Sequence, residues 1–409
     1  MANVTKCTFC GNPKREEEVF RGGISGVICK NCLLVCYNEI QNSKNTCEKQ
    51  LLENTHEKKL LKKIKPHLIK KELDKYVIGQ EEAKKILSVA VYNHYKKNNA
   101  NPNLDIDIKK SNVLLQGPTG TGKTYLMEIL AKILNVPLAI VDANIFTEAG
   151  YRGEDVEFII EKLLNITDWD IEKAEKGIVY IDEIDKISKN SFDEDRGDVS
   201  REAVQQALLR MLEGEEVSIN PTVSFFGEEK TTVDTSKILF VAGGAFVGIN
   251  KIIEERNPQN KKTIGFNTTE KIVSNNYNDE LTHGDLIKYG LTPEFVGRFP
   301  VLITLEELGK KDLKDILIKP KNSIIKQYEA LFKLDGVDLR FADDAIDYIV
   351  DEAITKKIGA RGLRSIIEKC MYKIMYDIPQ TNMKKVVITK DMLLGKGIKI
   401  NKNKAISQL

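Results

Sequence analysis

GPTGTGKT, residues Gly117–Thr124, is the stretch that decides the fold of this chain. It fits the pattern G-x-x-x-x-G-K-[ST] of a phosphate-binding loop. The apolar run 113–115 precedes it, and the helix-like YLMEILAKIL follows from Tyr125, so the loop joins a predicted strand to a predicted helix. Its glycines allow backbone N–H groups to face a phosphate at a helix N-terminus. The stretch therefore predicts a nucleotide site in an α/β domain.

A second motif follows in the strand-like segment IVYID at 178–182, which ends in Asp182 and continues with Glu183. Lys123 is expected to reach the β- and γ-phosphates, and the hydroxyl of Thr124 to hold Mg²⁺. Asp182 is expected to act on Mg²⁺ and Glu183 to polarise the attacking water. The two motifs together predict nucleotide hydrolysis.

Short apolar runs alternate with helical patterns across the middle of the chain. The predicted strands are VLL at 113, LAIVD at 138, IVYID at 178, ILFVA at 238 and VLIT at 301. Buried strands separated by helices predict a parallel, three-layer α/β domain. Beyond residue 305 the pattern is mostly helical, with one strand candidate at 384–389, which predicts a smaller second domain.

The composition is that of a globular protein, with 409 residues, 42% of them hydrophobic and 30% charged. The net charge of +2 gives no electrostatic case for a nucleic-acid or membrane partner. No apolar run approaches the length of a membrane span, and the N-terminus, MANVTKCTFCGN, has no signal-peptide core. We therefore expect a cytoplasmic protein.

Four of the seven cysteines form two C-x-x-C pairs, Cys7 with Cys10 and Cys29 with Cys32. This spacing predicts a zinc site with four thiolate ligands, which closes the tetrahedron and is therefore structural. Cys36 and Cys47 fall outside the pattern and are expected to be packing residues. An apolar stripe after Cys32, on Leu33, Leu34, Tyr37 and Ile40, fits either a dimer face or packing within the unit.

These patterns divide the chain into successive parts. We expect a zinc-binding domain at 1–47, a flexible linker at 48–62, a large phosphate-loop domain at 63–305, a small domain at 306–398 and a tail at 399–409.

The order of motifs resembles one family, ClpX, the AAA+ unfoldase subunit of the Clp protease. Besides the four-cysteine module, the resemblance rests on YVIGQEEAKK, GPTGTGKT, EAGYRGEDVE, GIVYIDEIDKI, VQQALL, DTSKILF, IGF, GLTPEFVGR and GARGLRS. It implies a AAA+ P-loop ATPase, with a three-layer α/β/α large domain, a mostly helical small domain and a small N-terminal zinc domain with four cysteine ligands. The implied cofactors are ATP, Mg²⁺ and Zn²⁺.

The resemblance also implies a homohexameric ring with dimerising zinc domains, which unfolds tagged proteins and passes them to a ClpP-type peptidase, with adaptors as further partners. Arg298 would be the arginine finger that reaches a neighbouring subunit, and Arg361 the second-sensor arginine that contacts nucleotide within its own chain. The implied nucleotide-binding residues are Val77, Ile78, Gly117, Pro118, Thr119, Gly120, Thr121, Gly122, Lys123, Thr124, Asp182 and Arg361.

Two further segments carry roles that the resemblance implies. Tyr151 would grip substrate in the pore, and Ile264-Gly265-Phe266 would dock on the peptidase. Arg152 departs from the family, which has an aliphatic residue there, and the basic loop expected before DTSKILF is missing from 220–230. We hypothesise that the positive charge that attracts substrate carboxylates has moved from the pore entrance to the first pore loop.

Two alternatives remain open from the sequence. One is a stand-alone remodelling chaperone without a peptidase, and the other is a motor that acts on nucleic acid through the zinc module. The sequence has no convincing Ser-His-Asp or Cys-His constellation and no H-E-x-x-H motif. We therefore expect an ATP hydrolase that is not itself a protease.

Overall fold

The computed structural model describes residues 20–22, 27–29, 65–99, 108–148, 156–189, 198–219, 231–256, 281–356, 358–377 and 383–394. The chain divides into two compact units, Met1–Ile64 and Lys65–Leu409. In the first unit, strand β1 (Phe20–Gly22) pairs antiparallel with β2 (Val27–Cys29), which puts Phe20 opposite Cys29. The remaining elements all belong to the second unit.

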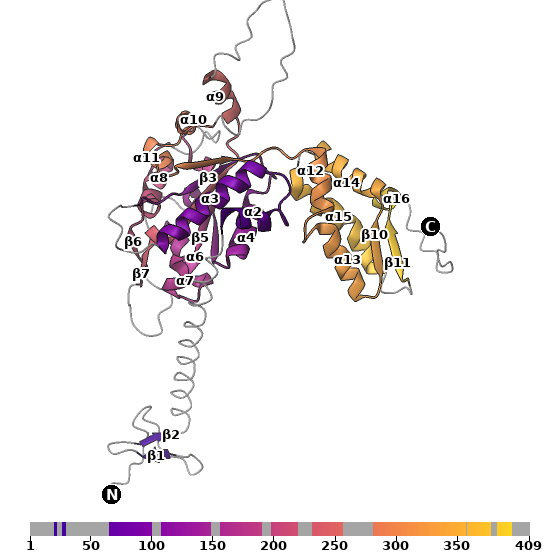
Figure 1. The fold of residues 1–409 in the computed structure, drawn as a ribbon, viewed down its shortest axis with the longest axis horizontal. Coiled ribbons are helices and arrows are strands. Elements are labelled where there is room, and N and C mark those ends of the chain that lie inside the picture. The colour runs from indigo at the N-terminus through magenta and orange to yellow at the C-terminus, as the bar shows by residue number, and fades with distance from the viewer. Residues whose placement is uncertain are drawn as a thin grey trace, which may run out of the picture. The chain divides into compact units, whose positions relative to one another are not determined.

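A parallel sheet forms the centre of the second unit (Figure 1). Within the described residues its order is β4 (Leu138–Asp142), β5 (Ile178–Asp182), β8 (Leu239–Gly244), β3 (Val113–Gln116) and β9 (Val301–Thr304). Every residue of β3 and β8 is buried, as the near-continuous apolar runs predict for strands that are covered on both faces. The predicted parallel α/β fold is therefore confirmed.

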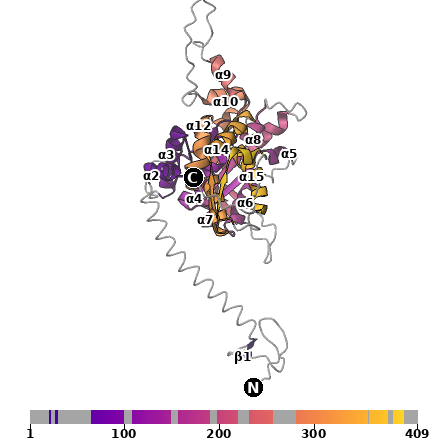
Figure 2. The same cartoon turned by 90° about the vertical axis from the view of Figure 1, so that its right-hand side faces the viewer.

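Helices cover both faces of this sheet, and Figure 2 shows α2, α3 and α4 on one side and α5, α6 and α8 on the other. The first group is α2 (Pro66–Leu73), α3 (Glu81–Asn98) and α4 (Lys123–Leu134). The second comprises α5 (Asn144–Glu148), α6 (Phe158–Ile166), α7 (Ile171–Glu175), α8 (Asp198–Glu213), α9 (Ile249–Arg256), α10 (His283–Tyr289) and α11 (Pro293–Val296). Residues of this second group share one apolar cluster with the sheet. We call 65–304 the large subdomain.

Helix α4 shows why the sequence folds as it does around the phosphate loop. Leu126, Leu130 and Leu134 are spaced four apart and all are buried, so one face of the helix packs on the sheet. Burying one such side chain contributes about 1.5–3 kcal/mol. The helix ends at Asn135, whose left-handed φ of 53° closes the last turn.

A small subdomain, which we define as 310–394, follows β9. It contains α12 (Lys310–Ile318), α13 (Ile324–Leu334), α14 (Asp343–Thr355), α15 (Gly359–Asp377) and α16 (Lys390–Leu393). Strand β10 (Asp338–Phe341) pairs parallel with β11 (Lys385–Ile388). A separate apolar cluster, to which Leu317, Ile349 and Leu363 belong, holds these elements together. The sequence predicted the strand at β11 but not its partner β10.

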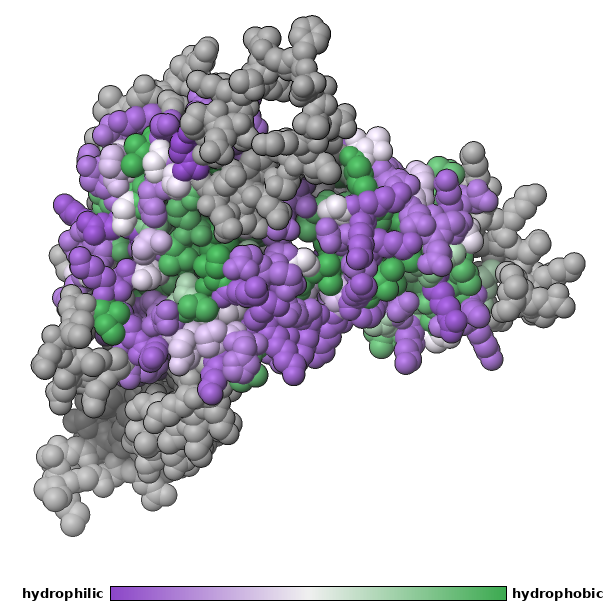
Figure 3. All heavy atoms as spheres, turned by 45° about the horizontal axis from the view of Figure 1, so that its top comes forward, coloured by the Kyte–Doolittle hydropathy of each residue, from purple (hydrophilic) through white to green (hydrophobic). Residues whose placement is uncertain are grey.

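Two short 3₁₀ helices, Ile184–Ile187 and Thr235–Lys237, and an antiparallel hairpin of β6 (Glu216–Ile219) and β7 (Thr231–Asp234) complete the large subdomain. Figure 3 shows that hydrophilic side chains cover much of the visible face, with apolar surface gathered between them over the large subdomain. None of the described helices is both long and apolar enough to cross a membrane.

Candidate functional site

The phosphate loop leaves β3 at Gln116 and enters α4 at Lys123. Gly120 and Gly122 have left-handed φ values of 81° and 94°, which glycine adopts at no steric cost. Gly117 is required for a different reason, because a Cβ added there would lie 2.9 Å from the Cβ of Leu305. Gly120 and Gly122 therefore allow the backbone to turn, and Gly117 allows Leu305 to pack closely against the loop.

The side chain of Lys123 is buried, and its ammonium donates to the loop's own carbonyl oxygens. The distances are 2.5 Å to the oxygen of Gly117 and 3.1 Å to that of Pro118. Burial lowers the pKa of Lys123, while the carboxylates of Asp182 and Asp185 act in the opposite direction. The ammonium is thus held inside the loop that is predicted to bind phosphate.

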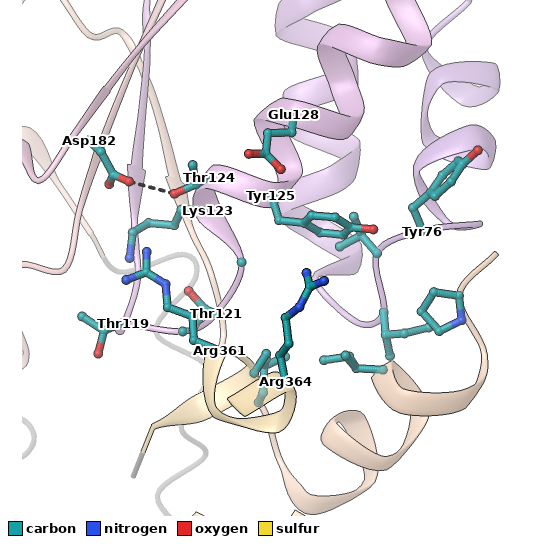
Figure 4. Close-up of a pocket in the computed structure, with 18 of the residues that line it drawn as sticks. Tyr76, Thr119, Thr121, Lys123, Thr124, Tyr125, Glu128, Asp182, Arg361 and Arg364 are labelled. Carbon is teal, nitrogen blue, oxygen red and sulfur yellow. Dashed lines mark hydrogen bonds between the residues drawn. The ribbon is translucent and has the colours of Figure 1, made fainter. Parts of the chain in front are cut away.

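The two predicted magnesium-binding residues meet where β5 ends and α4 begins (Figure 4). The Thr124 hydroxyl donates to Asp182 Oδ2 at 2.7 Å, and the Tyr180 hydroxyl donates to Asp182 Oδ1 at 3.1 Å. Burial, with the nearby Asp182 carboxylate, raises the pKa of Tyr180, so its hydroxyl remains a donor. Hydroxyl and carboxylate oxygens are the ligands that Mg²⁺ takes in proteins. Thr124 and Asp182 therefore fit this ion.

Glu183 follows Asp182 in a left-handed conformation with φ of 56°. Its Oε2 accepts a hydrogen bond of 2.7 Å from Nδ2 of Asn144. Asn144 comes just after β4, and the parallel register sets Asp142 beside Asp182, which brings Asn144 near Glu183. Sequence reasoning missed Asn144, because nothing local marks an asparagine at the start of a helix as part of a site.

The small subdomain contacts the phosphate loop through the start of α15. The N–H of Ala360 donates to the oxygen of Gly120 at 3.3 Å. Gly359 has a left-handed φ of 56°, and a Cβ added to it would lie 3.2 Å from the Cα of Gly120. Arg361 follows and points toward Lys123 (Figure 4). Backbone atoms thus join two motifs that are far apart in the sequence, GPTGTGKT and GARGLRS.

Lys123, Thr124, Asp182, Glu183 and Arg361 line a pocket of about 910 Å³. Its walls include the predicted Val77 and Ile78, together with Leu308, Ile316 and Pro320 from the segments after β9. One end is thus apolar and the other carries Lys123, Asp182 and Arg361. Apolar walls with a few convergent polar groups are typical of a cofactor site. Four lining residues were not among those predicted from the sequence: Tyr125, Glu128, Asp185 and Arg364. Asp185 and Arg364 lie within the motifs GIVYIDEIDKI and GARGLRS, whereas Tyr125 and Glu128 lie in α4 beyond the phosphate-loop motif.

Arg298 lies elsewhere in the large subdomain, just after α11. Its backbone oxygen accepts a hydrogen bond of 2.9 Å from Nδ2 of Asn112, and its guanidinium forms an ion pair with Glu213 at the end of α8. Among the described residues that line the pocket of its own chain, Arg298 does not occur.

Several predicted residues fall outside the part of the chain that the structure describes. They are Cys7, Cys10 and Cys32 of the zinc site, Tyr151 and Arg152 of the pore, and Ile264, Gly265 and Phe266 of the docking tripeptide. Cys29 is described only as the last residue of β2.

The fold and the site define a class, the AAA+ P-loop ATPases. The family model described as "AAA domain (Cdc48 subfamily)" matches residues 108–302, and that described as "C-terminal, D2-small domain, of ClpB protein" matches 308–387. These ranges correspond to most of the large and small subdomains.

Three curated relatives define the family more closely, and each is named "ATP-dependent Clp protease ATP-binding subunit ClpX". That of Treponema denticola is 44% identical over 97% of this chain and 95% of its own length. The relative of Borrelia duttonii is 45% identical over 97% of this chain and 92% of its own length. The relative of Bacteroides thetaiotaomicron is 44% identical over 94% of this chain and 94% of its own length. The chain belongs to the ClpX family. It is an ATP hydrolase and not itself a protease.

Proposed function

We propose that this chain is an ATP-dependent protein unfoldase and translocase that passes tagged proteins through a ring pore to a ClpP-type peptidase. The observation that carries the proposal is the shared pocket. Lys123, Thr124, Asp182 and Glu183 of the large subdomain line it together with Arg361 of the small subdomain. A pocket of this kind allows nucleotide state to set the relative position of two bodies.

Each side chain has a defined part in hydrolysis. Lys123 exchanges the carbonyls of Gly117 and Pro118 for phosphate oxygens, and Thr124 with Asp182 would hold Mg²⁺, which neutralises charge on the phosphates when bound. Glu183 orients the attacking water, and its hydrogen bond to Asn144 fixes the direction of the carboxylate. Arg361 binds the phosphates of the nucleotide in its own chain.

We further propose that the active form is a homohexamer. Arg298 belongs to the motif that supplies an arginine finger, yet it lies away from its own pocket. A neighbouring subunit's pocket is the natural target for it, and such a finger contributes about 10³–10⁵ in rate.

The remaining roles rest on the family resemblance. Cys7, Cys10, Cys29 and Cys32 bind Zn²⁺ in a dimerising N-terminal domain, Tyr151 and Arg152 contact substrate, and Ile264-Gly265-Phe266 dock on the peptidase. A cytoplasmic location would keep the cysteines reduced for zinc.

Loss of fluorescence from a stably folded, C-terminally tagged fluorescent protein tests the proposal. The reaction contains ATP, Mg²⁺, this chain and its cognate ClpP-type peptidase. We expect degradation that Glu183→Gln abolishes. Glu172→Gln makes the same change on the exposed side of α7 and should leave degradation intact.

Changing Ile264 and Phe266 together to Ala separates docking from motor activity. We expect ATP hydrolysis to persist while degradation stops. Unfolding of the reporter by the double variant without the peptidase, at the rate of the unchanged chain, would support this assignment. ATP hydrolysis with no unfolding of any tagged reporter would contradict the proposal, and unfolding with no gain from the peptidase would favour the stand-alone chaperone.

A further inference from the structure

The segment Leu305–Gly309, which we call the hinge segment, joins the large and small subdomains between β9 and α12. Its first two residues are held from both sides. On one side, the N–H of Leu305 donates to the oxygen of Gln116 at 2.7 Å, and Leu305 packs so closely on Gly117 that a Cβ on this glycine would not fit. The hinge segment therefore touches the start of the phosphate loop.

On the other side, Gln80 binds the hinge segment with both ends of its side-chain amide. Its Nε2 donates to the backbone oxygen of Glu306 at 2.8 Å, and its Oε1 accepts from the N–H of Glu306 at 2.9 Å. Gln80 is only 4% exposed. This pair of hydrogen bonds spans 226 positions of the sequence and joins the loop before α3 to the start of the hinge segment.

The backbone of Gln80 is held in an unfavourable conformation. Its φ of 57° and ψ of 38° are left-handed, and a non-glycine residue persists there only where its surroundings over-determine it. The preceding Gly79 is also left-handed, with φ of 67°. These two residues turn the chain sharply after Val77 and Ile78, which line the apolar end of the pocket. The turn thus links one pocket wall directly to the amide that holds Glu306.

We propose that Gln80 is a positioning residue that couples occupation of the pocket to the position of the small subdomain. A ligand base lying against Val77 and Ile78 fixes the loop before α3, and Gln80 transmits this restraint to Glu306. Leu308, two residues further on, again lines the pocket. Because the amide binds backbone atoms, the restraint acts on the path of the hinge segment itself. The inference rests on the proposed binding of ATP in this pocket.

The test measures the distance between the two subdomains in the full-length chain. Spin labels are placed through a non-canonical amino acid at Val89 on α3 and at Leu334 on α13, which are 46% and 85% exposed. Labelled chain is diluted into an excess of unlabelled chain, so that each ring carries one pair. Distances are recorded by pulsed electron spin resonance without nucleotide and with Mg²⁺ and the slowly hydrolysed analogue ATPγS.

Two variants remove the amide in different ways. Gln80→Met keeps the side-chain volume, and Gln80→Gly keeps the left-handed backbone without strain, so a folding defect in one does not decide the result. We expect ATPγS to shift the distance in the unchanged chain and the shift to be lost in both variants. The KM for ATP should rise about 5-fold or more, as is typical of a lost coupling between sites.

Gln205→Met is a matched control, since Gln205 makes the same pair of bonds within the large subdomain. Its Nε2 donates to the oxygen of Ile187 at 2.7 Å, and its Oε1 accepts from the N–H of Thr292 at 2.8 Å. This variant loses the same number of side-chain hydrogen bonds, which are more deeply buried than those of Gln80, and should keep the distance shift. A purely structural role for Gln80 would make the three variants behave alike.

Three results would overturn the inference: an unchanged shift in both Gln80 variants, equal loss of the shift in Gln205→Met, or no shift in the unchanged chain. The outcome is distinct from that of the degradation assay. If ATPγS shifts the distance in the unchanged chain and in Gln205→Met but not in the Gln80 variants, while no reporter is unfolded, the coupling through Gln80 stands and the unfoldase proposal fails.

Discussion

Gly359→Ala tests whether the backbone contact between α15 and the phosphate loop matters for nucleotide binding. The substitution has two costs that the structure separates. Alanine in the left-handed conformation of Gly359, with φ of 56°, costs about 1–2 kcal/mol of folding stability. In addition, the new Cβ lies 3.2 Å from both the Cα and the oxygen of Gly120, so the phosphate loop must yield.

Crowding of a packed site typically costs ~1–3 kcal/mol. If this free energy is lost from nucleotide binding because the phosphate loop is displaced, the dissociation constant rises about 5- to 150-fold. Gly336→Ala supplies the control, because Gly336 is also left-handed, with φ of 76°, but no heavy atom lies within 4 Å of an added Cβ. Both variants therefore carry the conformational cost, and only Gly359→Ala carries the crowding.

The measurements are a titration with a fluorescent ADP analogue and the free energy of unfolding in denaturant. We expect both variants to unfold more readily and only Gly359→Ala to bind nucleotide more weakly. Equal dissociation constants for the two variants would refute the reasoning, because the contact would then have no influence on the phosphate loop.

Three further predictions follow from the same structure. Asp182→Asn should raise the Mg²⁺ concentration that half-maximal ATP hydrolysis requires, and an unchanged Mg²⁺ dependence would remove this residue from the metal site. Mixing Arg298→Ala chains with Glu183→Gln chains should restore part of the ATP hydrolysis that each lacks alone, since each chain supplies what its neighbour needs; no recovery in mixed rings would contradict a finger acting between subunits. Burial lowers the pKa of His94 from 6.5 to about 4, so the folded state loses stability as pH falls from about 6.5 toward 4, because the unfolded state binds the proton first. A change of one in pKa corresponds to ~1.4 kcal/mol, so protonation of His94 lowers the free energy of unfolding by about 3 kcal/mol in total. The variant His94→Gln should flatten this part of the plot of unfolding free energy against pH.

The sequence predicted the fold well wherever local patterns and the final structure agree. Strands β3, β5 and β8 are apolar except for Gln116 and Asp182 at two of the strand ends, and burial on both faces requires such apolar runs. The partner β10 was missed, because DLRF at 338–341 alternates in polarity over four residues only and pairs with a strand far along the chain.

The candidate site was predictable where one motif holds several of its groups, as around Lys123 and Asp182. It was not predictable where a single residue reaches the site through tertiary structure. Asn144 reaches Glu183 only because β4 lies beside β5, and Gln80 reaches Glu306 only because the hinge segment returns beside α3. No local sequence pattern predicts either contact, because the first depends on the order of strands in the sheet and the second on the course of the hinge segment.

The bonds that Lys123 makes to the oxygens of Gly117 and Pro118 bear on how fast the motor can repeat its cycle. An ammonium with no hydrogen-bond acceptor other than phosphate would slow the release of the product nucleotide. Here two carbonyls stand within reach, and the ammonium can change partners as the product leaves. These two acceptors offset part of the free energy that the ammonium loses when it gives up a phosphate oxygen.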